Sequence, residues 1–196
     1  MESLIDDKIL DKSLCTENEK EKAYLKEIMG GKKFKTVLYY RGSRDGWNAE
    51  DFHRTSDGKG PTISLFKVQD NGYCIGGFTT VSWSSADHQD CGFGKDSSAM
   101  LFNLTTHHCF TPTNPSFSVR LNKAKGPNFG ENSLYAEEPF NEDQKIGSMI
   151  HKTCYNNVKD GQNIHLLTGT EGQKFRGMLT KFTISELEVW GVIMTE

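Results

Sequence analysis

The sequence is poor in apolar residues and has no long apolar run. Hydrophobic residues make up 35% of the 196 residues, and the mean hydropathy is −0.59. No stretch approaches the ~18 consecutive apolar residues that a membrane helix needs, and charges are scattered through the N-terminal region where a signal peptide would be apolar. The sequence therefore predicts a soluble, cytoplasmic protein that is not inserted in a membrane.

Cysteines are few, and neither sign of charge dominates. The five cysteines are an odd number at irregular spacing, which is typical of free thiols in a reducing compartment rather than of a disulfide framework. Lys and Arg number 23 against 26 Asp and Glu, for a net charge of −3, and there is no basic block. We therefore expect no nucleic-acid partner.

Glycine and phenylalanine are abundant, with 19 and 12 copies, which indicates many turns around an aromatic core. From residue 34 onward, short β-rich segments alternate with turn signals, which favours a mainly β fold over a helical bundle. Asp70, Asn71 and Gly72 are a hairpin signal between two of these segments. Strands are predicted at residues 34–40, 62–68, 73–82, 99–104, 117–121, 134–136, 165–169 and 182–192. Alternation along them places these side chains in the core: Val37, Tyr39, Ile63, Leu65, Phe78, Trp83, Leu101, Phe102, Phe182 and Val189.

The N-terminal region has a helical pattern instead. Thr16 and Glu19 have the spacing of a capping box, residues 25–29 continue with apolar side chains on one helix face, and Gly30 and Gly31 would end the helix. We therefore expect a helical extension over residues 1–33 and a β domain over residues 34–196. A second apolar set precedes the helix and consists of Leu4, Ile5, Ile9, Leu10 and Leu14. This extension is interpreted either as a lid on the domain or as a docking arm for another protein.

A polar loop is predicted between the first two strands. Residues 41–46 hold two arginines and two glycines, which fits an anion-binding loop, although Arg44 and Asp45 could simply form a local ion pair. Asn48 can cap a short helix with Asp51 at its third position, and Trp47 would pack against Phe52.

Two paired features lie inside predicted strands. Gly76 and Gly77 remove side chains where a strand normally has bulk, which indicates a bulge or a backbone or aromatic ring packed close by. Glu186 and Glu188 fall on one face of the last strand, and we interpret that face as solvated.

Histidines and cysteines lie near one another at three places. The pairs are His88 with Cys91, His107 and His108 with Cys109, and His151 with Cys154. Their spacing matches no recognised zinc motif, so we expect no metal and no cofactor. Cys91, His88 and Asp87 could be assembled into a catalytic trio, but no motif marks a serine or cysteine as activated.

An ordered set of segments runs along the chain: LYYRGSRDGW at 38–47, DFH at 51–53, GPTI at 60–63, GGFTTVSWS at 76–84, AMLFNL at 99–104, GPNFG at 126–130 and FTISELEVW at 182–190. Over about residues 34–193, this set resembles the TLDc domain family of oxidation-resistance-type proteins. Segments 87–95 and 138–161 diverge from the family pattern. The resemblance implies a β-sandwich of two antiparallel sheets edged by short helices, here preceded by the helical N-terminal arm.

The resemblance also implies a function. Family members are linked to binding of the vacuolar-type proton ATPase and to oxidative-stress protection, and no accepted enzymatic mechanism is attached to the fold. We therefore expect a non-catalytic protein-binding module acting on or within a large assembly. The alternative is a structural component of a cytoskeletal or ciliary (microtubule) complex. A redox or hydrolytic enzyme using Cys91 or His88 is the less favoured alternative.

Because sandwich faces are used by the core, partners should contact end loops and the N-terminal arm. The predicted partner-binding residues are Arg41, Arg44 and Trp47, the loop of Gly126, Pro127, Asn128, Phe129 and Gly130, and an apolar arm of Leu4, Ile5, Ile9 and Leu10.

Overall fold

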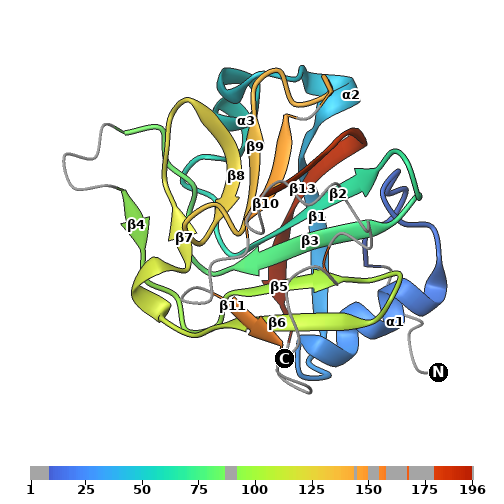
Figure 1. Cartoon of the computed structure of the whole chain (residues 1–196). Coiled ribbons are helices and arrows are strands. Elements are labelled where there is room, and N and C mark those ends of the chain that lie inside the picture. Colours follow the sequence, from blue (N-terminus) through green and yellow to red (C-terminus); the bar gives the residue numbers. More distant parts are fainter. Residues whose placement is uncertain are drawn as a thin grey trace.

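The computed structural model describes residues 9–86, 92–143, 145–149, 155–157, 167 and 179–195. These residues form two antiparallel sheets (Figure 1), which confirms the predicted fold class. The first sheet has the order β1 (Phe34–Arg41), β13 (Ile184–Met194), β2 (Thr62–Val68), β3 (Cys74–Thr79), β5 (Met100–Asn103), β6 (His108–Pro112) and β11 (Tyr155–Asn157). The second has the order β12 (Leu179–Phe182), β10 (Ile146–Met149), β9 (Leu134–Glu137), β8 (Lys125–Phe129), β7 (Val119–Arg120) and β4 (Phe93–Gly94).

The helices are short. They are α1 (Glu19–Ile28), α2 (Gly42–Asp45), α3 (Ala49–Ser56) and the 3-10 helix η1 (Pro115–Phe117). α1 packs on the outer face of the first sheet. α2 occupies part of the segment that the sequence predicted as a loop. In the described part of the chain, no helix is long and apolar enough to span a membrane.

Local sequence signals predict several elements well. β2 has the predicted bounds, and the hairpin turn that follows it has Gly72 at φ 69°, a backbone conformation that glycine adopts without strain. Asn48 and Asp51 form the predicted capping box of α3. Gly30 and Gly31 follow α1 with positive φ and bond back to its last carbonyls, as expected.

The predicted capping box of α1 is wrong. The N-cap is Asn18, whose side chain accepts a hydrogen bond from the backbone N–H of Lys20 at 2.9 Å. Thr16 lies before the helix and its hydroxyl donates to the carboxylate of Glu21 instead. Asn18 is itself a good capping residue, so the sequence offered two competing starts.

The predicted strand at 182–192 is two strands in different sheets. Phe182 pairs with Ile146 in the second sheet, and Ile184 pairs with Val68 in the first, so the chain crosses between sheets at Thr183. Strands β4, β6, β8, β10 and β11 were not predicted. The predicted strand at 165–169 lies outside the described residues except for Leu167, which is buried.

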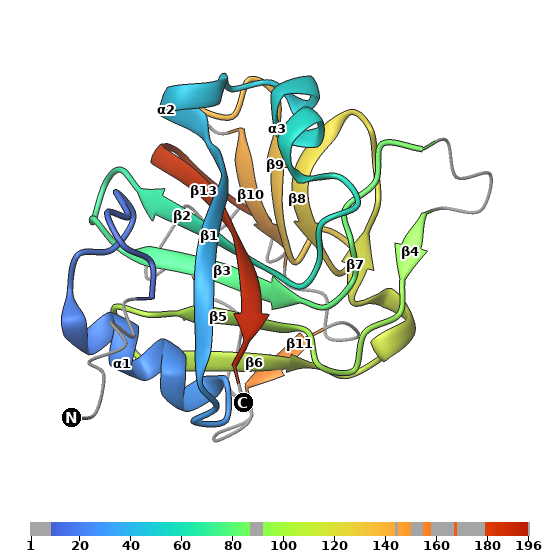
Figure 2. The same cartoon turned by 180° about the vertical axis from the view of Figure 1, so that it is seen from behind.

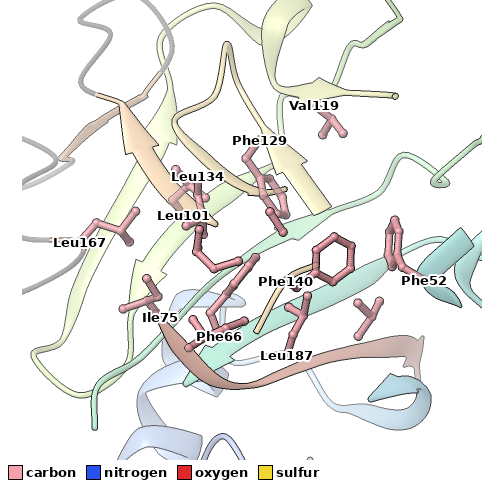
Figure 3. Close-up of a cluster of buried hydrophobic side chains, with 14 of the residues drawn as sticks. Phe52, Phe66, Ile75, Leu101, Val119, Phe129, Leu134, Phe140, Leu167 and Leu187 are labelled. Carbon is pink, nitrogen blue, oxygen red and sulfur yellow. The ribbon is translucent and has the colours of Figure 1, made fainter. Parts of the chain in front are cut away.

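The inner core lies between the two sheets. It combines Phe66, Ile75 and Leu187 from the first sheet with Phe129 and Leu134 from the second, as Figure 3 shows. Burying each such side chain contributes about 1.5–3 kcal/mol.

A second apolar cluster covers the opposite face of the first sheet. We call it the outer cluster, and it joins residues of the N-terminal segment to strand residues. In Figure 1, α1 lies toward the bottom of the view and the second sheet toward the top, with the first sheet between them. The outer cluster consists of Ile9, Leu10, Cys15, Tyr24, Leu25, Phe34, Ile63, Leu65, Cys74, Phe78, Phe102, Leu104, Trp190 and Val192.

The predicted core residues are buried, with two exceptions in β1. Val37 is exposed and Tyr39 is half-buried, so both predictions are wrong. The register between β1 and β13 shifts between Leu38 and Tyr40, which places Tyr40 rather than Tyr39 in the inner core. An inserted residue of this kind breaks the alternation on which the prediction depended. Four of the buried predictions, Ile63, Leu65, Phe78 and Phe102, belong to the outer cluster.

Gly76 and Gly77 are needed because aromatic rings pack against them. A Cβ atom on Gly77 would lie 2.6 Å from the ring of Phe129, and one on Gly76 would lie 2.9 Å from the ring of Phe102 and 2.1 Å from a backbone oxygen. The pairing of β3 with both neighbours is regular through these positions, so close packing rather than a bulge explains the two glycines.

Substituting Gly77 should overpack the inner core. We expect Gly77→Ala to lower the free energy of unfolding by about 1–3 kcal/mol in urea denaturation. Phe129→Leu in the same chain should recover part of that loss, because the smaller side chain makes room for the new methyl group. Strictly additive losses in the double variant would contradict the proposed contact.

Candidate functional site

Two acidic side chains of β13 point away from the inner core and are buried. Glu186 is 4% exposed and Glu188 is 0% exposed. The prediction of a solvated face is therefore wrong, because the N-terminal segment and α2 cover this face of the strand. Buried carboxylates are stable only when hydrogen-bonded or paired, which makes their surroundings the main polar site of the described residues.

Glu188 accepts hydrogen bonds from two distant segments and from its own strand. It accepts hydrogen bonds from the hydroxyl of Ser13 at 2.6 Å, the backbone N–H of Leu14 at 2.9 Å and the indole N–H of Trp190 at 3.0 Å. The guanidinium of Arg41 forms an ion pair with it, with Nε at 2.8 Å and a terminal nitrogen at 2.7 Å from Oε1. This carboxylate therefore links the N-terminal segment, β1 and β13.

Arg41 strengthens the same link from the other side. Its guanidinium also donates to the backbone oxygen of Lys12 at 2.7 Å, and its own backbone N–H donates to Asp45 at 2.8 Å. The hydroxyl of Ser13 accepts from the backbone N–H groups of Cys15 and Thr16 at 3.2 Å each. The turn before α1 is thus built around these polar contacts.

Glu186 holds α2 in a similar way. Its carboxylate accepts hydrogen bonds from the hydroxyl and the backbone N–H of Ser43, and from the backbone N–H of Leu187 at 3.0 Å. Ser43 is therefore positioned by a buried acid.

Arg44 and Asp45 form a local ion pair. The guanidinium of Arg44 binds both carboxylate oxygens of Asp45, at 2.8 and 2.7 Å, and the carbonyl of Tyr39 at 3.0 Å. Burial acts to raise the pKa of Asp45, but the hydrogen bonds from Arg44 and from the Arg41 backbone outweigh it, so the pKa lies below its ordinary value. Of the two interpretations of this loop, the geometry favours the ion pair over an anion site. The side chain of Arg44 remains 48% exposed.

Trp47 packs inside the same end of the sandwich. Its ring lies against Gly42, where a Cβ atom would be 2.4 Å from it, and its carbonyl accepts from the backbone N–H of Phe140 at 2.8 Å. Phe52, its predicted neighbour, makes edge contacts with Tyr40 and Trp83. Trp47 is half-buried, so only part of its ring is open to a partner.

Other predicted partner contacts are buried within the chain. Residues 126–130 are not an exposed loop: all five are buried and most belong to β8, with Gly126 packed against the ring of Phe140. Ile9 and Leu10 are buried in the outer cluster, which agrees with a lid rather than an exposed arm. Leu4 and Ile5 lie outside the described residues.

The described histidines and cysteines make internal contacts. Cys15 and Cys74 are buried free thiols, and burial raises the pKa of each well above its ordinary value. His107 stacks on Tyr24 with ring centroids 4.6 Å apart, and His108 contacts Thr106 at 2.8 Å. The described residues contain no group of three or more metal-ligating side chains. Asp87, His88, Cys91, His151 and Cys154 lie outside them, so the expectation about metal stays a prediction.

One histidine and carboxylate pair links α3 to β8. His53 lies 2.6 Å from Asp57 through Nδ1, and its Nε2 faces the backbone oxygens of Asn122 and Lys125 at 3.1 Å each. Both ring nitrogens are thus occupied by contacts within the chain, as in a structural histidine.

Sequence reasoning missed the residues that fix the N-terminal segment and α2. Ser13 and Ser43 bind the two acids of β13, and Thr16 and Thr105 both donate to the buried carboxylate of Glu21. One sequence signal for a buried polar site was available in β13 itself. Two acids, two residues apart, interrupt this apolar strand on the face that also carries Trp190.

A protein-family model described as the TLDc domain matches residues 8–193. The chain belongs to the TLDc domain family. No curated protein matches it. The TLDc match covers nearly the whole chain and includes α1, in agreement with the outer cluster that joins residues 9–29 to the first sheet. Apolar side chains on the two sides of the expected domain boundary, between residues 33 and 34, therefore pack against each other.

The ion pair of Glu188 with Arg41 should be essential for stability. We expect Glu188→Ala to lower the free energy of unfolding by about 3–5 kcal/mol, because it leaves a partly buried guanidinium without its carboxylate. Glu19→Ala is the control, because the Glu19 side chain, which pairs with Lys22 on α1, is 84% exposed, and the loss of this pair should cost less than about 1 kcal/mol. Equal losses in the two variants, measured by chemical denaturation, would rule out this role.

The buried thiols should be unreactive in the folded protein. In a variant with Cys91, Cys109 and Cys154 replaced by serine, we expect Cys15 and Cys74 to react with iodoacetamide at least about 100-fold more slowly in the native state than in denaturant. The raised pKa keeps each native thiol protonated even at pH values around its ordinary pKa, where the unfolded thiol already ionises, and the thiolate is the reactive form. Rapid native alkylation, followed by mass spectrometry, would show that this region opens.

Proposed function

We propose that this TLDc chain is a non-catalytic protein-binding module that acts in the cytoplasm on or within a large protein assembly. TLDc domains are generally regarded as binding modules, and membership of the family supports this part of the proposal. The family's link to the vacuolar-type proton ATPase makes that enzyme the first candidate assembly, with a role in oxidative-stress protection.

The observation that carries the proposal is that the polar side chains beside α2 are all engaged in contacts within the chain. Arg41, Ser43, Glu186 and Glu188 are residue types that could bind or transform a ligand, yet each is engaged with other groups of the chain. Their contacts hold three segments together, which is a structural task. A rigid scaffold of this kind positions exposed residues for a partner.

Arg44 is the predicted contact that best fits this function. Its side chain is 48% exposed, and Asp45 and the Tyr39 carbonyl fix its direction. An exposed and oriented guanidinium can bind a carboxylate with little loss of side-chain freedom.

The test is recovery of a partner assembly from native extract with the tagged protein. We expect stoichiometric recovery, which Arg44→Glu should reduce at least tenfold while the exposed control Lys20→Glu changes it less than twofold. Identifying the recovered proteins separates the vacuolar-type ATPase from a cytoskeletal or ciliary complex.

Two results would contradict the proposal. One is the absence of any stoichiometric partner. The other is a turnover activity of the purified protein that Cys91→Ala or His88→Ala abolishes, which would favour the enzymatic alternative.

A further inference from the structure

β1 ends the seven-stranded sheet and offers a strand edge. It pairs with β13 on one side, and no strand within the described ranges pairs with its other side. Figure 2 shows β1 crossing the centre of the view between α2 and the turn after α1. From Phe34 to Leu38 the register with β13 is regular, so no bulge interrupts the stretch that another strand would join. Unpaired backbone groups on such an edge are a template for strand addition.

The two faces of β1 are covered differently. On the outer face, Phe34 belongs to the outer cluster and the hydroxyl of Thr36 accepts the backbone N–H of Leu10 at 2.7 Å. On the inner face, Lys35 lies directly opposite Ile193, and Val37 follows two residues later. Val37 is 44% exposed and Ile193 is 49% exposed, so the inner face carries an open apolar strip at this edge.

Positive charges border this apolar strip. Lys32, Lys33 and Lys35 are exposed, and no acidic residue occurs between Lys32 and Arg41 in the sequence. At the other end of the strip, the ammonium group of Lys59 lies 4.9 Å from the ring centre of Tyr39. Val37 therefore has a cation on each side along the strand.

We propose that the β1 edge binds an extended acidic segment of a partner protein as an added strand. The segment carries an acidic, an apolar and an acidic residue at every second position. Side chains two residues apart lie on one face of a strand, so the apolar residue rests beside Val37 while the acids face Lys35 and Lys59. This inference rests on the proposed function and names the chemistry of the partner.

A second copy of this chain fits the edge less well. In antiparallel pairing of two β1 strands over residues 34–38, Lys35 of each copy lies opposite Val37 of the other and diagonal to its Lys35, which places two like charges within reach of each other on one face. Lysines at a strand edge are a known means of blocking self-association. The same lysines attract an acidic strand, so charge selects between the two occupants.

The test uses a fluorescein-labelled peptide, GSETVTEGS, whose two glutamates and valine have the required spacing. We expect saturable binding to the full chain by fluorescence anisotropy. Lys35→Glu should weaken it at least tenfold, whereas Lys20→Glu, on exposed α1, should change it less than twofold. The charge-reversed peptide GSKTVTKGS should show the opposite preference and bind Lys35→Glu better than the native chain.

Further peptides separate strand addition from attraction by charge alone. GSEETVTGS has the same composition without the spacing and should bind at least fivefold more weakly. Two N-methylated forms of GSETVTEGS, one blocked along each edge, should differ, because the edge that faces β1 must donate its N–H groups. Equal binding of all these peptides, or equal effects of the Lys35 and Lys20 substitutions, would overturn the proposal.

The same variants distinguish this inference from the proposed function. Peptide binding as described, with no assembly recovered from native extract, would leave the edge site standing and remove the proposed function. If Lys35→Glu recovers the assembly undiminished and the native chain binds no peptide, the edge site is ruled out and the proposed function stands.

Discussion

The buried carboxylate of Glu188 is the interaction on which the rest of the structure depends. Removing a charge from water is costly, and the penalty is offset only when strong donors surround the charge. Glu188 obtains them from Trp190 on its own strand and from Ser13, Leu14 and Arg41, which are far from it in the sequence. If the N-terminal segment moved away, the carboxylate would lose two donors while its ion pair became exposed. Satisfying one acid therefore fixes the position of that segment on the sheet.

This arrangement makes β13 the centre of two layers of packing. Leu187 and Val189 face the inner core, whereas Trp190 and Val192 face the outer cluster. The central strands of the first sheet are therefore buried on both faces, by the second sheet on one side and by residues 9–29 on the other. β2 and β3 are accordingly buried at nearly every position and not at alternate ones. Because residues 9–29 cover one face of this sheet, the N-terminal segment is part of the folded unit.

The sequence predicts what depends on neighbouring residues and misses what depends on distant ones. The bounds of β2, its hairpin turn and the capping box of α3 follow from signals within a few positions. The aromatic packing on Gly76 and Gly77 was also indicated, because two glycines in a strand need a close neighbour. The burial of Glu188 depends on Ser13, 175 positions earlier in the chain, and no spacing rule connects them. Likewise, one inserted residue at Tyr39 reverses the alternation that β1 otherwise follows.

The separation of stabilising and exposed residues bears on where a proposed partner would bind this TLDc domain. The polar groups beside α2 make contacts within the chain, so substituting them is expected to lower stability more directly than partner binding. At the β1 edge the position is different: Val37 and Ile193 remain open on the inner face. The register shift at Tyr39 turns Tyr40 into the core, so the stretch from Phe34 to Leu38 is anchored at both ends while one face stays free. A strand held in this way needs no ordering when a partner adds to it, so the conformational cost of binding falls mainly on the partner segment.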